Sequence, residues 1–317
     1  MKVLVTGGAG FIGSHVAERL LADGHEVVVL DDLSTGHVGY LPAGARFYQM
    51  DLRSPWLDEM FRIERPEAVV HQAAQASVRR SVEDPVSDAG INVLGTAALL
   101  QAGVRHQVRR FLFASTGGAI YGDTELIPTP EDAPAVPVSP YGAAKLAAEV
   151  YLRTFHALHG LSYAALRYAN VYGPRQDPHG EAGVVAIFSQ RLLAGEPTRI
   201  NGDGRQTRDF VYVGDVAEAN ARALVSDAVG SFNVGTGIET DINRIFALLA
   251  QLTGSRQSEE HGPPLPGEQR RSAVDARKIG RVMGWQPGRD LQAGLRATVQ
   301  YFRERAPAPP ATRARPA

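Results

Sequence analysis

Short apolar runs alternate with amphipathic stretches through the first half of the chain. Five apolar segments have the length of a strand: residues 2–5, 26–30, 46–48, 68–71 and 110–114. The second of them is almost entirely apolar, which is typical of a strand buried on both faces. Helical periodicity occupies segments between them, near 12–22, 55–63 and 85–102. This alternation predicts an α/β protein with a doubly wound parallel sheet and helices on both sides.

Three glycines connect the first predicted strand to the first predicted helix. Gly7, Gly10 and Gly13 are spaced G-x-x-G-x-x-G, with Phe11 and Ile12 between the last two. Glycines at this spacing permit a tight turn, let the backbone approach a pyrophosphate and let the helix pack closely on the strand. The helix N-terminus also directs free N–H groups toward phosphate. These residues therefore predict the phosphate-binding turn of a Rossmann-type dinucleotide site.

Acidic residues follow the second predicted strand. Asp31 and Asp32 lie roughly 20 residues beyond the glycine turn, where a carboxylate accepts hydrogen bonds from the adenosine ribose. A carboxylate at this position also repels a 2′-phosphate. The sequence therefore predicts that the cofactor is NAD rather than NADP.

The next two strands also end in residues that we expect near the cofactor. Asp51 and Leu52 follow the third strand, and Asp51 either contacts the adenine amino group or caps the helix that begins near residue 55. The fourth strand ends at His71, which we interpret as structural rather than as an acid–base group. The residues after it are predicted to line the cofactor site: Gln72, Ala73 and Ala74.

The second half predicts a smaller unit built from discontinuous pieces. It contains a helix at 184–193, a strand at 230–234 that returns to the sheet, and a helix capped by Thr240 or Asp241. The last helix has one apolar face: Ile242, Ile245, Phe246, Leu248 and Leu249. We expect a Rossmann NAD-binding domain at 1–172 with a return segment near 205–237, a mainly substrate-binding α/β domain at 173–305, and a disordered Pro/Ala-rich tail at 306–317.

Composition narrows the functional classes. The 317 residues carry a net charge of -1, so no nucleic-acid or membrane partner is expected. No apolar run approaches the ~18 residues of a membrane span, and the chain begins directly with a strand, so we expect no signal peptide and a cytoplasmic location. Without cysteines the chain has no disulfide, zinc–thiolate site or thiol nucleophile, and no metal site is predicted. Only three residues are lysines: Lys2, Lys145 and Lys278.

One of these lysines completes a catalytic pattern. Ser115 and Thr116 end the fifth strand, and Ser139 and Pro140 are suited to start a helix that carries Tyr141 and Lys145 on one face. A phenol with a reference pKa of ~10 is a poor base at neutral pH. An ammonium nearby, together with a positive nicotinamide ring, favours the phenolate and lowers that pKa. The pair can then remove a proton from an alcohol while hydride leaves for NAD.

Several long motifs occur in the order found in one family. Besides the glycine turn and the Tyr-x-x-x-Lys pair, these are Asn92-Val93-Leu94-Gly95-Thr96, Leu166-Arg167-Tyr168-Ala169-Asn170-Val171-Tyr172-Gly173-Pro174 and the run 202–213. Together they resemble the extended short-chain dehydrogenase/reductase superfamily, in its NAD-dependent epimerase/dehydratase family. The resemblance covers nearly all of residues 1–305 and is closest to UDP-glucose 4-epimerases.

The resemblance implies roles for individual residues. Tyr141 would be the base, Lys145 its partner, and Thr116, with or without Ser115, would bridge the sugar 4-hydroxyl. The other implied contacts are Tyr168 beside the nicotinamide, Asn92 near the cofactor or in support of the active site, Asn170 and Arg208 on the substrate diphosphate, and Glu268 on the ribose hydroxyls. The resemblance also implies a UDP-sugar substrate, tightly held NAD and a homodimer formed by helices at 85–102 and 141–159.

The sequence departs from the family pattern at three places. The segment Gly117-Gly118-Ala119 is one residue longer than the commonest epimerase pattern, and Ala76 replaces a lysine of one epimerase group. Leu265 stands where an arginine contacts the uridine or phosphate, a role that Arg270 or Arg271 could take. A small residue, Ser272, at the position facing the sugar C2 substituent admits N-acetylated sugars.

These observations favour a UDP-glucose/UDP-galactose 4-epimerase that works through a 4-keto intermediate. A 4,6-dehydratase needs an Asp-Glu pair where this chain has Gly117 and Gly118, and glycine cannot move a proton. Epimerases of UDP-glucuronate or UDP-N-acetylhexosamine remain open. A UDP-sugar decarboxylase, a simple reductase and a non-catalytic NAD-binding regulator are weaker alternatives, the last because a regulator needs no Tyr-x-x-x-Lys base.

Overall fold

The computed structural model describes residues 1–179, 183–264 and 269–305. Its centre is a seven-stranded parallel sheet with the strand order β10-β6-β5-β4-β1-β2-β3. The strands are β1 (Lys2–Thr6), β2 (Glu26–Asp31), β3 (Arg46–Gln49), β4 (Ala68–His71), β5 (Arg110–Thr116), β6 (Ser162–Tyr168) and β10 (Gly230–Val234). All five strands predicted in the first half are present. The predicted tail at 306–317, Leu265 and Glu268 lie outside the described residues.

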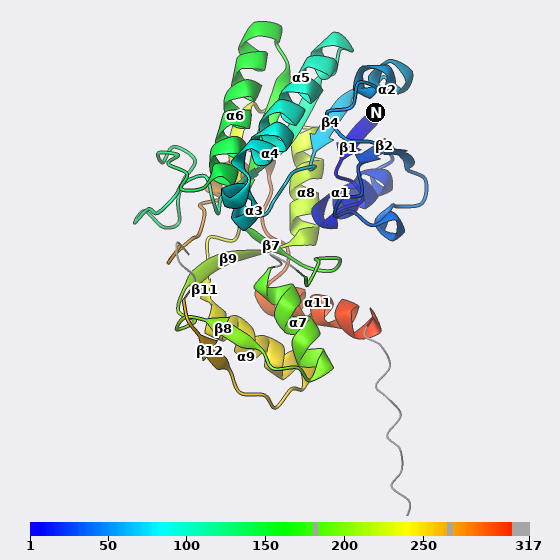
Figure 1. Cartoon of the computed structure of the whole chain (residues 1–317). Helices are drawn as coiled ribbons and strands as arrows, with labels where there is room; N and C mark the ends of the chain where they lie inside the picture. Colours follow the sequence, from blue (N-terminus) through cyan, green and yellow to red (C-terminus); the bar gives the residue numbers. More distant parts are fainter. Residues whose placement is uncertain (180–182, 265–268, 306–317) are drawn as a thin grey trace, which may run out of the picture.

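Helices cover both faces of the sheet, as the alternating pattern predicts (Figure 1). On one face, α1 (Phe11–Ala22) packs beside α8 (Val213–Leu224), and both contribute apolar side chains to one core cluster. On the other face, a second cluster contains α2 (Leu57–Glu64), α5 (Thr96–Arg105) and α6 (Pro140–His159). The Rossmann-type doubly wound architecture is thus confirmed.

The predicted helix at 85–102 is not uniform. After the short α3 (Val78–Glu83), the chain forms α4 (Pro85–Ala89), a wider π-helical turn, η2 (Gly90–Gly95), and then α5. Such wide turns displace the following side chains from their regular positions and are frequent at functional sites. Periodicity in the sequence could not reveal this insertion, because the apolar residues still recur at helical spacing.

A smaller lobe lies beyond the carboxyl ends of the strands (Figure 1). It contains a three-stranded sheet of β7 (Asn170–Tyr172), β9 (Thr207–Tyr212) and β11 (Glu239–Asp241), and a pair formed by β8 (Arg199–Asn201) and β12 (Glu260–Gly262). Its helices are α7 (Val184–Ala194), α9 (Ile242–Thr253) and α11 (Leu291–Arg305), and the short α10 (Arg277–Met283) packs on β10 of the large sheet.

The sequence predicted two helices of this lobe, α7 and α9, but not α10 or α11. Asp241, rather than Thr240, caps α9 by accepting a hydrogen bond from the N–H of Arg244 at 2.7 Å. The predicted apolar face of α9 is buried in the core of the lobe. The chain returns from the lobe to the large sheet through α8 and β10, which pairs in parallel with β6. No helix of the described residues is long and apolar enough to cross a membrane.

Candidate active site

The glycine turn has the backbone geometry that a pyrophosphate requires. Gly7 has a φ of +67°, and a Cβ there would lie 2.6 Å from the backbone N of Ala73. A Cβ on Gly13 would collide with the carbonyl oxygen of Gly7, so close packing of α1 on β1 requires glycine. Gly10 precedes α1 and supplies no side-chain cap. The first N–H groups of this helix, which include those of Phe11 and Ile12, are therefore suited to phosphate oxygens.

The two aspartates after β2 have different surroundings. Asp31 is buried beside the glycine turn and accepts hydrogen bonds from the N–H of Ala9 at 3.0 Å and of Leu33 at 2.9 Å. Burial raises the pKa of Asp31, although these two N–H groups oppose the rise. Asp32 is exposed and binds Ser34 within its own loop. Asp31 is thus the carboxylate beside the glycine turn, and its contact with the adenosine ribose stays a prediction.

Asp51 does not cap a helix. It forms an ion pair with Arg53, 2.6 Å between Oδ2 and Nη2, and this cation lowers the pKa of Asp51. The following helix α2 begins only at Leu57, after Trp56. The capping alternative is therefore wrong, and Asp51 remains at the carboxyl end of β3 beside the buried Leu52.

The residues after β4 are held against the glycine turn. The N–H of Ala73 donates to Thr6 Oγ1 at 3.3 Å, and the amide of Gln72 donates to the hydroxyl of Tyr168 at 3.0 Å. Ala74 follows in the same loop. Tyr168 lies at the carboxyl end of β6, where Asn220 of α8 also contacts its hydroxyl. These bonds hold the loop and Tyr168 at the edge of the sheet where the nicotinamide is predicted.

His71 has a structural role, as the sequence interpretation held. Its ring nitrogens contact Thr6 Oγ1 at 2.7 Å and Thr96 Oγ1 at 2.9 Å inside the protein. Burial lowers the pKa of His71 to about 3. The neutral ring joins β1, β4 and α5 and is not available as an acid–base group at neutral pH.

Ser115 and Thr116 contact different residues of α6. Thr116 hydrogen-bonds to the hydroxyl of Tyr141 and accepts from the N–H of Ala119 at 3.2 Å. Ser115 is buried and donates to Glu149 Oε1 at 2.5 Å. Glu149 is in turn paired with Arg167 at 2.7 Å. Of the two hydroxyls left open by the sequence, that of Ser115 is engaged with a buried carboxylate, and Thr116 remains the proposed contact of the sugar.

Tyr141 and Lys145 occupy the first turns of α6. Ser139 caps this helix by accepting from the N–H of Gly142 at 3.2 Å, and Pro140 is the first helical residue. The i,i+4 spacing places Lys145 Nζ 5.8 Å from the centre of the Tyr141 ring. Nζ is buried and donates to the carbonyl oxygen of Ala114 on β5 at 2.8 Å. The phenol, the ammonium and the Thr116 hydroxyl thus meet at the end of β5.

The protein's own groups do not by themselves lower the pKa of the phenol, an effect that the sequence prediction assigned jointly to Lys145 and a nicotinamide ring. Burial raises the pKa of Tyr141 to about 12, the negative charge of Asp88 adds to the rise, and the bond with Thr116 opposes it. Burial lowers the pKa of Lys145 to about 8, while the charges of Asp88 and Glu149 oppose this change. The side chains of the chain alone therefore keep the phenol protonated. Lys145 by itself does not supply enough positive charge to outweigh the burial of Tyr141.

Asn92 belongs to a polar network with Gln75 and Asp88, and the sequence analysis did not identify Asp88. Its amide oxygen accepts from the N–H of Gln75 at 3.0 Å, and its amide nitrogen donates to the carbonyl oxygen of Gln75 and to Asp88 Oδ1, both at 2.9 Å. The network holds the loop after β4 against η2. Asp88 was missed because an aspartate in an amphipathic segment resembles an ordinary surface residue.

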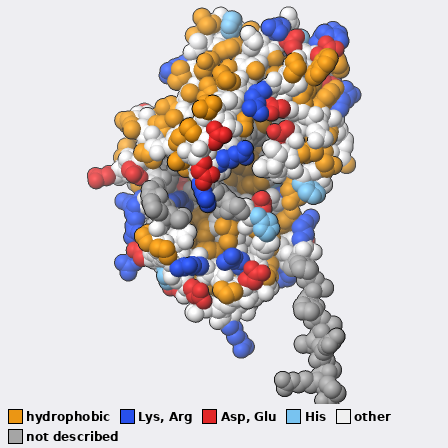
Figure 2. Space-filling model, viewed as in Figure 1, with side chains coloured by type: hydrophobic (Ala, Val, Ile, Leu, Met, Phe, Trp, Pro, Cys, Tyr) orange, Lys and Arg blue, Asp and Glu red, His pale blue; other side chains and the backbone are white. Residues whose placement is uncertain are grey.

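The substrate side combines β7, β9 and the loop after β5. Asn170 is exposed at the start of β7, and a Cβ on Gly118 would lie 3.7 Å from its side-chain oxygen. Arg208 is half-buried on β9, where its Nη1 donates to the carbonyl oxygen of Thr207 at 2.8 Å. Figure 2 shows this face of the molecule hollowed between the two lobes, with acidic and basic side chains along the rim.

The arginines considered as replacements at Leu265 are committed to other partners. Arg270 pairs with Asp203 at 2.9 Å, and Arg271 pairs with Glu239 at 2.5 Å. These pairs lie on the surface of the smaller lobe. Ser272 is buried beside them, and the amide of Gln269 donates to the carbonyl oxygen of Gly122 at 2.7 Å. The segment after Glu268 is thereby tied to the loop that follows β5.

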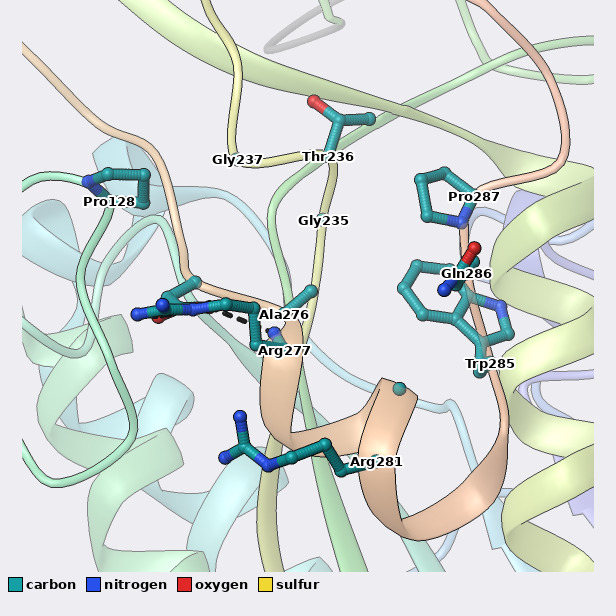
Figure 3. Close-up of a pocket in the computed structure, with 12 residues that line it drawn as sticks. Pro128, Gly235, Thr236, Gly237, Ala276, Arg277, Arg281, Trp285, Gln286 and Pro287 are labelled. Atoms are coloured by element: carbon teal, nitrogen blue, oxygen red, sulfur yellow. Dashed lines mark hydrogen bonds and ion pairs between the residues drawn. The ribbon is translucent and has the colours of Figure 1, made fainter.

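A cavity of about 790 Å³ lies apart from all of these residues, beside α10 and the loop after β10 (Figure 3). Its lining includes Gly235, Gly237, Arg281 and Trp285, and Arg277, which is paired with Asp275. None of the predicted site residues lines this cavity. The catalytic groups instead lie at the carboxyl ends of the strands, where doubly wound sheets bind their ligands.

The chain is similar to known proteins over most of its length. The model of the NAD-dependent epimerase/dehydratase family matches residues 3–235. A UDP-glucose 4-epimerase of Mycolicibacterium smegmatis is 47% identical over 311 residues, which cover 96% of this chain and 99% of that protein.

Solved structures extend the similarity to the whole fold. A Thermotoga maritima UDP-glucose 4-epimerase with UDP-glucose superposes with a TM-score of 0.94 at 48% identity, covering 96% of this chain and 99% of the other. A Thermus thermophilus UDP-glucose 4-epimerase in complex with NAD gives 0.92 at 49% identity with the same coverage. The chain therefore belongs to the NAD-dependent epimerase/dehydratase family.

Proposed function

We propose that the protein is an NAD-dependent UDP-sugar 4-epimerase that interconverts UDP-glucose and UDP-galactose. The observation that carries this proposal is the meeting of Tyr141, Lys145 and Thr116 at the carboxyl end of β5, on the same sheet edge as the glycine turn and Asp31. The similarity to UDP-glucose 4-epimerases over nearly the whole length of both chains supports the choice of reaction.

The residues of the nucleotide site fit NAD. Glycine is required at positions 7 and 13, where a Cβ would strike the backbone, so the turn leaves α1 open to a pyrophosphate. The buried carboxylate of Asp31 lies beside this turn, at the place of the adenosine ribose. NAD, when bound, would supply the hydride acceptor and a positively charged nicotinamide ring. Tyr168, Gln72 and Asn92 would hold the edge of the sheet around that ring.

Tyr141 is the residue that we propose takes the proton from the sugar and returns it. The phenol needs nearby positive charge to lose its proton, because burial and Asp88 raise its pKa. Lys145 supplies one positive charge from the same face of α6, and Thr116 donates a hydrogen bond that favours the phenolate. In this reading Tyr141 takes the proton of the sugar 4-hydroxyl as the 4-keto sugar forms, and returns it after the sugar has turned over.

The smaller lobe would anchor the diphosphate while the sugar turns. Asn170 is exposed close to Gly118, and Arg208 offers a positive charge on the adjacent strand β9. An anchor on the diphosphate leaves the hexose free to present either face to the same base. Glu268 remains a proposed contact of the ribose hydroxyls.

The loop after β5 argues against a dehydratase. A Cβ on Gly117 would lie 2.6 Å from Val274 and near the carbonyl oxygen of Arg167, so this position does not accommodate the longer side chain of an acid. Gly118 offers no group that can move a proton. Elimination of water needs such a pair of groups, whereas epimerisation needs only Tyr141.

We further propose that the enzyme is a homodimer in which α6 contributes to the contact. Three large apolar side chains of this helix are exposed: Val150, Tyr151 and Leu158. Apolar side chains grouped on one helix are typical of a surface that another chain covers. Sedimentation equilibrium of the wild-type protein and of a Leu158→Glu variant tests this; a monomeric wild type would contradict it.

The experiment that tests the function is direct. Purified protein is incubated with NAD and UDP-glucose, and the products are separated by anion-exchange chromatography. UDP-galactose is the expected product, and parallel reactions with UDP-N-acetylglucosamine and UDP-glucuronate define the sugar range. Failure to epimerise any of the three would contradict the proposal. Release of a pentose or of free NADH would instead indicate a decarboxylase or a reductase.

A further inference from the structure

A buried carboxylate lies next to the catalytic helix without a cation of its own. Asp88 is 1% exposed on α4. Its Oδ1 accepts hydrogen bonds from the side-chain amides of Gln75 at 2.8 Å and Asn92 at 2.9 Å. Its Oδ2 is buried and has no hydrogen-bond partner among the described residues. Neutral amides hold this side chain in place but do not balance its negative charge, which is costly to bury alone.

Lys145 is a buried positive charge in the same region of the protein. The residue is 3% exposed, and its ammonium donates a hydrogen bond to a neutral group, the carbonyl oxygen of Ala114. Within the described ranges it forms no ion pair with a carboxylate closer than 4 Å. A buried ammonium of this kind loses its proton easily unless a negative charge lies near it.

The charged groups of the elements around Asp88 indicate which cation balances its charge. Elements packed against α4 are α3, η2 and α6. The charged residues of α3 are exposed, and η2 has no titratable residue. On α6 the titratable groups facing the site are Tyr141, Lys145 and Glu149. Glu149 is already paired with Arg167 at 2.7 Å, so among the described residues of these elements Asp88 is the buried anion and Lys145 the buried cation for which no ion pair is formed.

We propose that Asp88 is the counter-charge of Lys145, a positioning residue that keeps the catalytic ammonium protonated while Gln75 and Asn92 hold its carboxylate in place. The significance for epimerisation rests on the proposed function, but the charge pairing itself does not. In line with this arrangement, burial lowers the pKa of Lys145 to about 8, and the charge of Asp88 is the larger of the two that oppose the change. Because Asn92 lies on η2, the π-helical turn takes part in orienting the carboxylate of Asp88.

The small number of lysines makes a direct test possible. Protein labelled with 13C at lysine Cε gives three signals, and Lys2→Arg and Lys278→Arg variants identify by elimination the signal of Lys145. Its chemical shift is followed from pH 6 to pH 10.5 in wild type and in Asp88→Asn. We expect the pKa of Lys145 to fall by about one unit in the variant. The signals of Lys2 and Lys278 serve as internal references and should be the same in the two proteins at each pH.

Two variants separate charge from structure. Asp84→Asn makes the same change of charge at the exposed cap of the same helix α4, and should leave the pKa of Lys145 unchanged. Asp88→Glu keeps the charge and should keep the pKa closer to wild type than Asp88→Asn does. If circular dichroism shows that Asp88→Asn is unfolded, Asp88→Ser takes its place with the same expectation.

The outcomes distinguish the inference from the proposed function. An unchanged pKa of Lys145 in a folded variant that lacks the carboxylate overturns the role of Asp88, whatever the activity. A lowered pKa in a protein whose wild type epimerises no UDP-sugar supports the pairing and contradicts the proposed function. In an active enzyme, Asp88→Asn should also move the alkaline limb of kcat to lower pH without changing KM, because Asp88 does not touch the sugar nucleotide.

Discussion

Ser115 and Thr116 are adjacent on β5, yet their hydroxyls belong to separate hydrogen-bond networks. Thr116 contacts the phenol of Tyr141, and Ser115 donates to the buried carboxylate of Glu149. Both partners lie on α6, Tyr141 in its first turn and Glu149 two turns further on, so the half-buried Thr116 hydroxyl is assigned to the reaction and the buried Ser115 hydroxyl to the core.

Substituting each residue should therefore change a different property, turnover for Thr116 and stability for Ser115. Thr116→Val should lower kcat by about 10- to 100-fold, since it removes a hydrogen bond that favours the reactive phenolate. Ser115→Ala should leave kcat close to wild type but lower the free energy of unfolding by about 1–3 kcal/mol, because Glu149 loses a buried donor. Steady-state kinetics and urea unfolding measure both. Equal loss of kcat in the two variants would contradict the division.

Tyr141→Phe should lower kcat by at least about 100-fold, because it removes the group that exchanges a proton with the sugar. NAD affinity, measured by isothermal titration calorimetry, should change little, since the glycine turn and Asp31 are untouched. A variant that keeps wild-type turnover would refute the assignment of the base.

Gly13→Ala should weaken NAD binding. The added methyl group would collide with the carbonyl oxygen of Gly7 and displace the start of α1. Overpacking of this kind costs about 1–3 kcal/mol, equivalent to a roughly 5- to 150-fold rise in Kd. Gly103→Ala is the control, because a Cβ there lies at an ordinary 3.6 Å from Val108. NAD titrations that give the same Kd for both variants would be inconsistent with this account.

The buried ammonium should make stability depend on pH in a defined direction. The pKa of Lys145 is about 8 in the folded protein and 10.5 in its ordinary state, so the unfolded chain binds more protons between these values. The contribution of Lys145 to the free energy of unfolding should therefore increase by about 3 kcal/mol as the pH rises from about 8 to 10.5. Urea unfolding of wild type and Lys145→Met at pH 7 and pH 10 measures it. A difference between the two proteins that stays constant with pH would contradict the lowered pKa.

The buried pair of Glu149 and Arg167 should be far more sensitive than a surface pair. Arg167→Met leaves Glu149 buried without its cation and should cost about 3–5 kcal/mol of unfolding free energy. Arg79→Ala breaks the exposed pair with Glu83 and should cost about 0.5 kcal/mol or less. Thermal unfolding compares them, and similar losses would argue against a buried network beneath the active site.

The layered architecture and the sheet edge that carries the site were predictable from the sequence. Continuous apolar runs and glycine spacing are local properties, so they placed β2, the glycine turn and the start of α6 within a residue or two. The protonation states of Tyr141 and Lys145 were not predictable in the same way. How deeply Tyr141 and Lys145 are buried, and which anion approaches them, depends on packing between α4 and α6, which no spacing along the chain encodes.

The path of the chain through α8 and β10 has a consequence for dissection of the protein. A fragment ending at residue 172 would contain the glycine turn and the catalytic pair, but β6 would become an open edge and α1 would lose the helix it packs on. Such an edge invites pairing with other chains. The nucleotide-binding half is therefore not a separable module, and its autonomous expression should give aggregated material rather than a working oxidoreductase.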